Sequence, residues 1–302
     1  MGNFPRLSEF LQQLLNGLSL GAIYALIALG YTMVYGVLRF INFAHSDVFM
    51  VGAFIGYYLG KLVPENTVWG GLVVLIVAML GCAVLGMLIE KLAYRPLRGA
   101  PTLNVLITAI GVSLLLEYSG QVFFGATPRT FPAVFPSVNF SFGDLVISSN
   151  QVVVIVVATI LMVALEFIVH RTKIGTAMRA VSLNPKAAQL VGINNDVVIS
   201  FTFGLGSALA AAGGILYALN YPSIDPLMGV MPGLKAFVAA VLGGIGNIPG
   251  AALGGLLLGT VETFVNGSQW STYKDAIAFA ILIIILLFRP AGLLGRSSVE
   301  KV

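Results

Sequence analysis

Long apolar runs recur along the chain, and they constrain its fold more than any other feature. Runs of about 20 residues, the length that crosses roughly 30 Å of hydrocarbon as a helix, follow one another from residue 12 to residue 289. Only 9% of the residues are charged, whereas soluble domains carry roughly 25%. The chain therefore cannot cover an ordinary globular surface with polar groups. The sequence predicts an all-α, polytopic integral membrane protein.

Eight hydrophobic segments are expected, and the seventh is too long for one straight span. We place the segments at 12–38, 41–62, 68–90, 103–124, 150–170, 197–219, 234–266 and 274–289. Glycines and a proline interrupt the seventh segment near 243–250, which favours two shorter helices, 234–245 and 250–266, on either side of the break. This predicts about 8–9 transmembrane helices in a single domain that covers residues 1–302.

Basic residues are distributed unevenly between the two sides of these spans. Eleven of the 16 Lys and Arg residues fall on the side of the 171–196 loop and the C-terminus, and five fall on the other. Because cytoplasmic loops are enriched in Lys and Arg, we expect the N-terminus outside and the C-terminus in the cytoplasm. The net charge of +4 then reflects topology and not nucleic-acid binding. The outer set is Arg6, Lys61, Arg129, Lys235 and Lys274, and the inner set is Arg39, Lys91, Arg95, Arg98, Arg171, Lys173, Arg179, Lys186, Arg289, Arg296 and Lys301.

The polar stretch at 171–196 carries signals of ordered structure. Asn184 followed by Pro185 is typical of a helix start, where a side-chain oxygen caps free backbone N–H groups and proline loses no hydrogen bond. Gly192 fits the end of this short helix because glycine adopts the left-handed conformation at little cost.

One apolar face is expected on this helix. Ala187, Leu190 and Val191 follow the i, i+3, i+4 spacing, and a second short helix is expected over 176–183. Two small helices between membrane spans suggest a docking surface. A solvated basic loop is the alternative that the spacing leaves open.

Polar residues at membrane depth are costly and point to function. Asn42, His45 and Asp47 lie together where the second apolar run begins, so they are candidates for contact with a transported solute at a break between spans. A hydrated inner loop is the alternative. No metal site is expected, because His45 and Asp47 have no further His or Cys nearby.

A second set of polar candidates lies in the fourth run. Asn104, Thr108 and Glu117 are placed on one broad helical face that lines a pathway. Pairing of Glu117 with a neighbouring helix is the alternative. Glu90, Glu166 and Glu262 lie near span ends, where a carboxylate reaches water, and no role is assigned to them.

Motifs for catalysis or nucleotide binding are not found in the sequence. VLGGIGNIPG lacks the Gly-Lys-Ser/Thr ending of a P-loop, and HExxH does not occur. We therefore expect a protein that is not an enzyme and holds no cofactor, and any nucleotide must bind to another chain. The frequent small-residue spacings, such as Gly17 with Gly21, predict close helix packing.

Three stretches in order resemble one family. LNGLSLGAIYALIALGYTMVYGVLRFINFAHSD, RTKIGTAMRAVSLNPKAAQLVGI and LKAFVAAVLGGIGNIPGAALGGLLLG are similar to the permeases of branched-chain amino acid ABC importers, the LivH type. The resemblance extends over nearly the whole chain. Ser46 stands where that family commonly has a glycine after the histidine.

The resemblance implies a bacterial inner-membrane permease. Its partners would be two ABC ATPase subunits inside, a substrate-binding protein outside and a second, related permease chain in a heterodimer. In that family the cytoplasmic loop carries coupling helices that contact the ATPase, and the matching residues here are Gly175, Arg179, Ala180, Asn184, Ala187 and Gly192.

Other functions stay open on the sequence. Related importers move urea or short amides, and the three stretches do not exclude these substrates. An ATP-independent carrier or channel is a further alternative, but such carriers often keep acidic residues in mid-span, where this sequence has few. A membrane enzyme would need an active-site set that the sequence does not contain.

Overall fold

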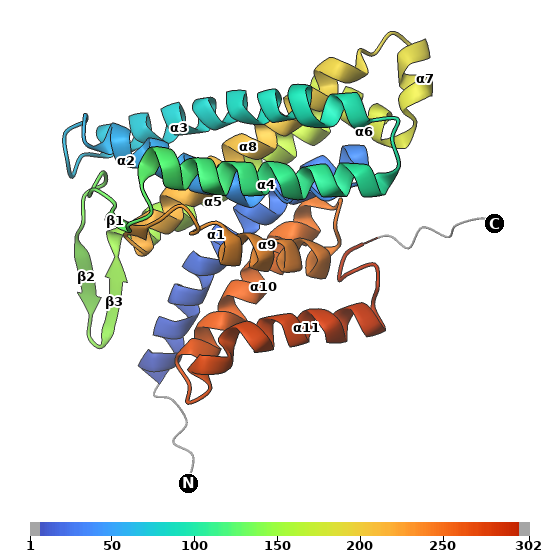
Figure 1. The fold of residues 1–302 in the computed structure, drawn as a ribbon. Coiled ribbons are helices and arrows are strands. Elements are labelled where there is room, and N and C mark those ends of the chain that lie inside the picture. Colours follow the sequence, from blue (N-terminus) through green and yellow to red (C-terminus); the bar gives the residue numbers. More distant parts are fainter. Residues whose placement is uncertain (1–6, 296–302) are drawn as a thin grey trace.

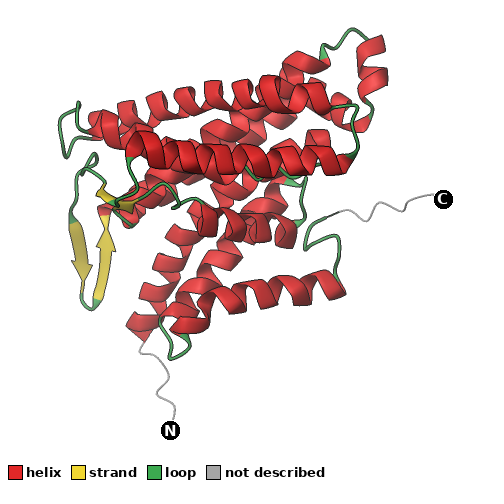
Figure 2. Cartoon of the chain, in the orientation of Figure 1, coloured by secondary structure: helices red, strands yellow, loops and turns green. Residues whose placement is uncertain are grey.

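Helices dominate the computed structural model, which describes residues 7–295 (Figures 1 and 2). Seven of these helices are long and apolar enough to cross a membrane, so the predicted all-α polytopic membrane fold is confirmed. Arg6, Arg296 and Lys301, which the charge count includes, lie outside the described residues. The helices are α1 Leu7–Leu38, α2 His45–Gly60, α3 Val68–Ile89, α4 Thr102–Phe124, α5 Ser149–Arg171, α6 Lys173–Leu183, α7 Pro185–Leu190, α8 Asn195–Asn220, α9 Val230–Gly243, α10 Ile248–Asn266 and α11 Lys274–Phe288.

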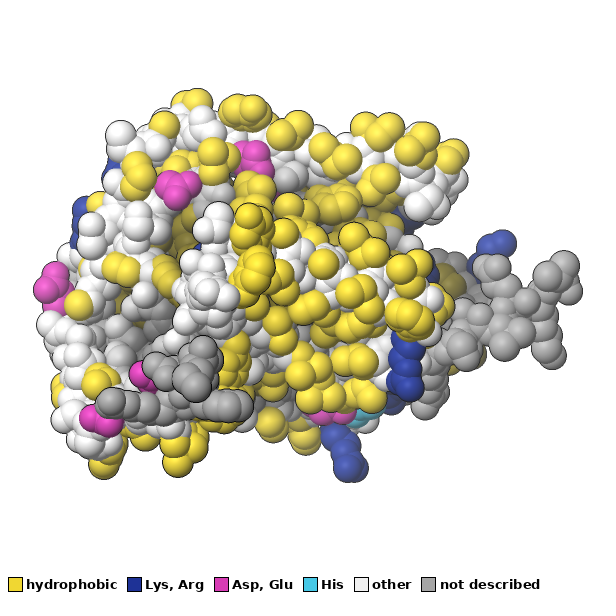
Figure 3. Space-filling model, turned by 90° about the horizontal axis from the view of Figure 1, so that it is seen from below, with side chains coloured by type: hydrophobic (Ala, Val, Ile, Leu, Met, Phe, Trp, Pro, Cys, Tyr) yellow, Lys and Arg dark blue, Asp and Glu magenta, His cyan; other side chains and the backbone are white. Residues whose placement is uncertain are grey.

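Two helices form the centre of the molecule and others surround them. In its most apolar stretch, α1 has 94% of its residues buried, and α8 has 78%. The corresponding share is 17% for α4 and 6% for α11. Apolar side chains accordingly cover the middle of the face shown in Figure 3. A surface of this kind is stable against lipid tails or another membrane chain, and not against water.

Small residues set how closely α1 and α10 approach. A Cβ atom at Gly259 would lie 2.3 Å from the Gly21 Cα atom, and one at Gly255 would lie 2.4 Å from the Ala25 Cα atom. Any larger side chain would push the two backbones apart. In lipid, where close packing drives helix association, this contact explains the small-residue spacing, and the packing prediction is confirmed.

The predicted break in the seventh apolar segment is also confirmed. Helix α9 ends at Gly243, and α10 begins at Ile248. Gly244 and Gly246 between them adopt φ angles of +105° and +91°, which favour glycine. The Asn247 side chain then caps α10 by accepting a hydrogen bond from the Gly250 backbone N–H at 3.2 Å.

Helix α2 starts inside the protein and not at its surface. The sequence places the second run at 41–62, whereas the helix begins at His45. The His45 ring lies against Gly30, eight residues or about 12 Å before the end of α1. The segment before α2 therefore folds back into the protein, a turn that begins at Arg39 with φ +58°.

Helix α3 continues past its expected end. A π-helical turn at Glu90–Tyr94 and a 3₁₀ turn at Arg95–Leu97 extend it. The short π turn carries one extra residue and turns the following side chains toward new neighbours. This extension brings Glu90, Arg95 and Arg98 close to the start of α8.

Four short strands lie at one end of the molecule (Figure 2). Strand β2 Asn139–Phe142 pairs antiparallel with β3 Leu145–Ser148, and β1 Arg129–Thr130 pairs antiparallel with β4 Ser223–Ile224. The β2–β3 hairpin lies in the connection between α4 and α5.

The two ends of the molecule differ in what they hold. The start of α1 and the β2–β3 hairpin lie at one end, and α7 and the end of α11 lie at the other (Figure 1). We call these the α1 end and the α7 end. In Figure 3, Lys and Arg side chains are prominent toward the α7 end.

Candidate functional site

The predicted short helices of the 171–196 loop are present at the α7 end. Helix α6 begins three residues earlier than expected, at Lys173, and α7 covers Pro185–Leu190. The Asn184 side chain accepts a hydrogen bond from the Ala187 backbone N–H at 3.0 Å, which is the predicted cap. Gly192 follows α7 with φ +86°, so the predicted helix end is confirmed as well.

Helix α6 folds back tightly onto the end of α5. A Cβ atom at Gly175 would lie 2.2 Å from the Ile168 carbonyl oxygen, so only glycine fits this position without a shift of the backbone. The Arg179 guanidinium donates a hydrogen bond to the Val169 carbonyl at the C-terminal end of α5. Met178 and Val181 are buried. Gly175 and Arg179 therefore hold the loop in place from within.

The apolar face that the sequence predicts on α7 lies at the surface. Leu190 and Val191 are 88% and 76% exposed, and Leu183 just before α7 is 85% exposed. Ala187 is exposed beside them. Exposed apolar clusters of this kind mark contact surfaces. We call Leu183, Ala187, Leu190 and Val191 the α7 patch.

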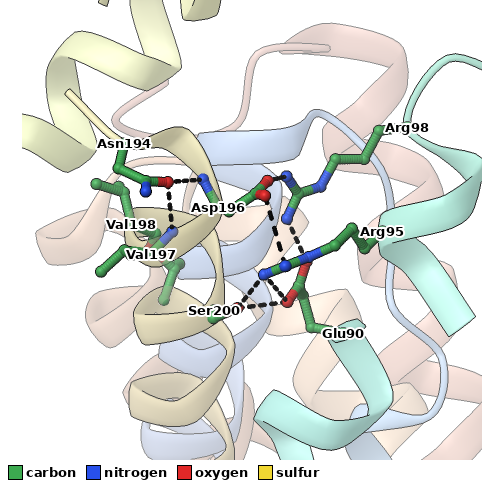
Figure 4. Close-up of polar contacts among 9 residues, drawn as sticks. Glu90, Arg95, Arg98, Asn194, Asp196, Val197, Val198 and Ser200 are labelled. Atoms are coloured by element: carbon green, nitrogen blue, oxygen red, sulfur yellow. Dashed lines mark hydrogen bonds and ion pairs between the residues drawn. The ribbon is translucent and has the colours of Figure 1, made fainter. Parts of the chain in front are cut away.

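An ionic cluster joins the extension of α3 to the start of α8 (Figure 4). The Glu90 carboxylate is fully buried, and its Oε2 atom accepts hydrogen bonds from Arg95 Nη2 at 3.5 Å and Ser200 Oγ at 2.5 Å. Arg98 contacts both Glu90 and Asp196. We call these five residues the Glu90 cluster. The sequence predicts no role for Glu90, because a carboxylate near a span end ordinarily reaches water.

The first group of polar candidates is enclosed in the protein. The Tyr94 hydroxyl donates to Asn42 Oδ1 at 2.6 Å, and the Ser113 hydroxyl donates to Asp47 Oδ2 at 2.5 Å. His45 packs on Tyr31 with 4.7 Å between ring centroids. Asn42, His45 and Asp47 are all buried, which contradicts the alternative of a hydrated loop.

The second group is not gathered on one face. Thirteen residues at about 100° each place Glu117 roughly 220° around α4 from Asn104. Asn104 is exposed, and Thr108 and Glu117 are half-buried. The broad shared face proposed from the sequence is therefore wrong for this pair. Ser113 is the α4 residue that contacts Asp47.

A large polar cavity at the α1 end was missed entirely. It has a volume of about 860 Å³ and lies between α1, α8, α9, α10 and the starts of α5 and α11. Lys235 and Glu262 line it and are buried, with 2.6 Å between Lys235 Nζ and Glu262 Oε1. Lys235 Nζ is also 2.6 Å from Asp275 Oδ1, and the Tyr24 hydroxyl donates to Glu262 Oε2 at 2.8 Å.

No sequence signal other than charge itself marks this cavity. Lys235 and Glu262 each stand near the end of an apolar run and read as residues that reach water. They meet because α9 and α10 form an antiparallel pair after the Gly/Pro break. The spacing of 27 residues between them matches no local pattern.

Known proteins resemble the chain over nearly all its length. A family model described as branched-chain amino acid transport system / permease component matches residues 13–286. The chain is 43% identical to the high-affinity branched-chain amino acid transport system permease protein BraD of Pseudomonas aeruginosa, over 99% of this chain and 100% of that protein. It is 42% identical to the corresponding LivH protein of Escherichia coli, over 97% and 98% of the two chains. A probable LivH protein of Methanocaldococcus jannaschii is 30% identical, over 90% and 89%.

Proposed function

The chain belongs to the family of branched-chain amino acid transport permease components, and on this basis we propose that it imports leucine, isoleucine and valine in an ATP-driven assembly. It is a multi-pass membrane transport subunit and not an enzyme. ATP hydrolysis belongs to partner chains. The single observation that carries the proposal is the full-length similarity to permeases of this transport class.

The α7 patch is the proposed contact with the ATPase. Its exposed apolar side chains support a docking role, since an unpartnered patch of this size in water is otherwise a liability. Of the six coupling residues, Ala187 belongs to the patch itself. Asn184 and Gly192 bound α7. Gly175 and Arg179 hold α6 against α5, and the Ala180 carbonyl accepts a hydrogen bond from the Asn184 backbone N–H at the end of α6.

Movement would pass from this patch into the spans. ATP binding closes the ATPase pair and displaces the patch, and the Glu90 cluster connects the adjoining start of α8 to α3. ATP binding can shift the permease between two conformations only if these conformations differ in affinity for nucleotide or for the loaded binding protein.

The proposed orientation places the α7 end in the cytoplasm of a bacterial inner membrane. The N-terminus would lie outside and the C-terminus inside, with residues 1–302 forming one permease domain around the 171–196 coupling loop. The Lys and Arg side chains toward the α7 end support this assignment. The β2–β3 hairpin would then face the substrate-binding protein.

A second, related permease chain completes the proposed assembly as a heterodimer. The low burial of α4 and α11 within this chain supports a membrane-embedded contact with lipid and with that chain. For the substrate pathway we propose the interior group Asn42, His45 and Asp47 together with polar residues of α4, of which Glu117 lies one turn from Ser113. The Ser113–Asp47 hydrogen bond supports a connection between the two groups.

Purification from native membranes in mild detergent tests the assembly. We expect an ATPase and a second permease to travel with this chain, and ATP-dependent leucine uptake after reconstitution with the binding protein. Uptake of urea or short amides in place of leucine would show that the importer has one of these substrates and not a branched-chain amino acid. Recovery of the chain alone, with transport in liposomes without ATP, would overturn the ABC proposal in favour of a carrier or channel.

A further inference from the structure

The cavity at the α1 end is lined by charged side chains of both signs. Two basic and two acidic residues line it, namely Lys235, Lys274, Glu262 and Asp275. Lys235 and Glu262 are buried at 5% and 6% exposure. Charged groups buried inside a membrane protein are expensive, and they ordinarily mark a ligand or ion pathway.

The existing contacts of these charges suggest what else they can hold. Lys235 Nζ lies 2.6 Å from both Glu262 Oε1 and Asp275 Oδ1. A lysine has three N–H donors, so it retains one for a carboxylate from a ligand. Asn150 also lines the cavity, and its buried Oδ1 atom has no hydrogen-bond partner among residues 7–295. A buried acceptor without a partner is costly, and a ligand ammonium group would satisfy it.

Apolar side chains complete the wall. Leu20, Leu219 and Met231 line the same cavity. Its volume of about 860 Å³ lies within the range of small-molecule sites, roughly 300–1,000 Å³. A matching ligand therefore carries one positive group, one negative group and a compact aliphatic part.

We propose that this cavity binds the transported α-amino acid as a zwitterion, with Lys235 contacting its carboxylate and Glu262, Asp275 and Asn150 contacting its ammonium group. This inference rests on the proposed function and narrows it, because neutral urea and short amides do not need a charged pair. The cavity floor at Tyr24 lies six residues, about 9 Å along α1, before Gly30 and the enclosed His45. The site thus stands on the outer side of the interior polar group.

The test measures the contribution of each charged group of the ligand to binding. Binding to the purified permease–ATPase complex, without the binding protein, is measured for L-leucine, for leucinol, which lacks the carboxylate, and for 4-methylpentanoate, which lacks the amino group. We expect both analogues to bind at least about tenfold more weakly than leucine, the loss of one charged contact. Lys235→Gln should remove most of the preference for leucine over leucinol. Glu262→Gln should remove most of the preference for leucine over 4-methylpentanoate.

Two controls separate a binding role from a structural one. Lys61→Gln and Glu65→Gln make the same chemical changes at the α1 end outside the cavity, and they should leave all three affinities unchanged. The charge swap Lys235→Glu with Glu262→Lys keeps an ion pair. It should restore thermal stability and assembly but not leucine binding, because the positive and negative groups exchange places.

The outcomes distinguish this inference from the proposed function. If wild type imports leucine with ATP, and both single variants keep wild-type preferences among the three ligands, the cavity assignment is overturned and the proposed function stands. Recovery of leucine binding by the charge swap would also overturn it, as the pair would then be structural. A wild-type complex that transports only urea or amides would overturn both.

Discussion

Arg98 and Asp196 form an ion pair between residues 98 positions apart in the chain. Arg98 follows the irregular extension of α3, and Asp196 lies in the first turn of α8, at the end of the coupling loop. The same arginine contacts the buried Glu90 carboxylate. The contact thus ties the two helices together at the point where the loop enters the membrane-spanning part.

Removing the buried charge should destabilise this junction. Glu90→Gln leaves Arg95 and Arg98 without their central anion, and we expect a loss of about 2 kcal/mol in the free energy of unfolding. This is less than the roughly 3–5 kcal/mol typical of a broken buried pair, because both arginines are partly exposed. Thermal unfolding in detergent measures the change.

Asp196→Asn is the matched control for that substitution. The Asp196 side chain is half exposed, so we expect its loss to cost less than about 1 kcal/mol. Equal destabilisation by the two variants would contradict the central position of Glu90 in the cluster.

A charge on the α7 patch should prevent ATPase docking without unfolding the permease. Leu190→Asp places a carboxylate on a side chain that is 88% exposed, so the fold keeps its contacts. We expect ATPase affinity to fall by about 30-fold or more, as for a central apolar contact of about 2 kcal/mol, measured by binding of the purified ATPase. Lys186→Ala, also exposed on α7, is the control, and an equal loss there would argue against the patch.

A methyl group at Gly175 should disturb the coupling loop. In Gly175→Ala the new Cβ atom would lie 2.2 Å from the Ile168 carbonyl oxygen and 2.3 Å from that of Val169, so α6 must shift. We expect lower thermal stability and weaker ATPase binding together. Gly111→Ala in α4 meets nothing within 4 Å and should be neutral or stabilising by up to about 1 kcal/mol. Unchanged ATPase binding in Gly175→Ala would contradict the tight fit.

Cysteine labelling tests the proposed orientation. The native Cys82 is buried, and Cys82→Ala provides a background for two single-cysteine variants at exposed positions, Leu7→Cys and Leu190→Cys. A membrane-impermeant maleimide added to intact cells with a permeable outer membrane should label the first at once. It should label the second only after the inner membrane is opened. The reverse pattern would invert the topology.

Local features of this chain were readable from the sequence for a physical reason. The spans follow from apolar length, because a membrane requires about 20 residues per helix. The cap at Asn184, the helix end at Gly192 and the break before α10 follow from backbone preferences of single residues. The α7 patch followed from helical spacing within a few residues. Each of these signals is complete within one segment.

Only the tertiary structure decided what the charged residues near span ends do. Glu90 and Glu262 look alike in the sequence, since each stands where a carboxylate reaches water. The fold buries the first against Arg98 and α8, and the second against Lys235 at the cavity. These partners come from other helices, so depth and pairing depend on how the helices pack. The same holds for α2, whose start at His45 is enclosed because α1 continues past it.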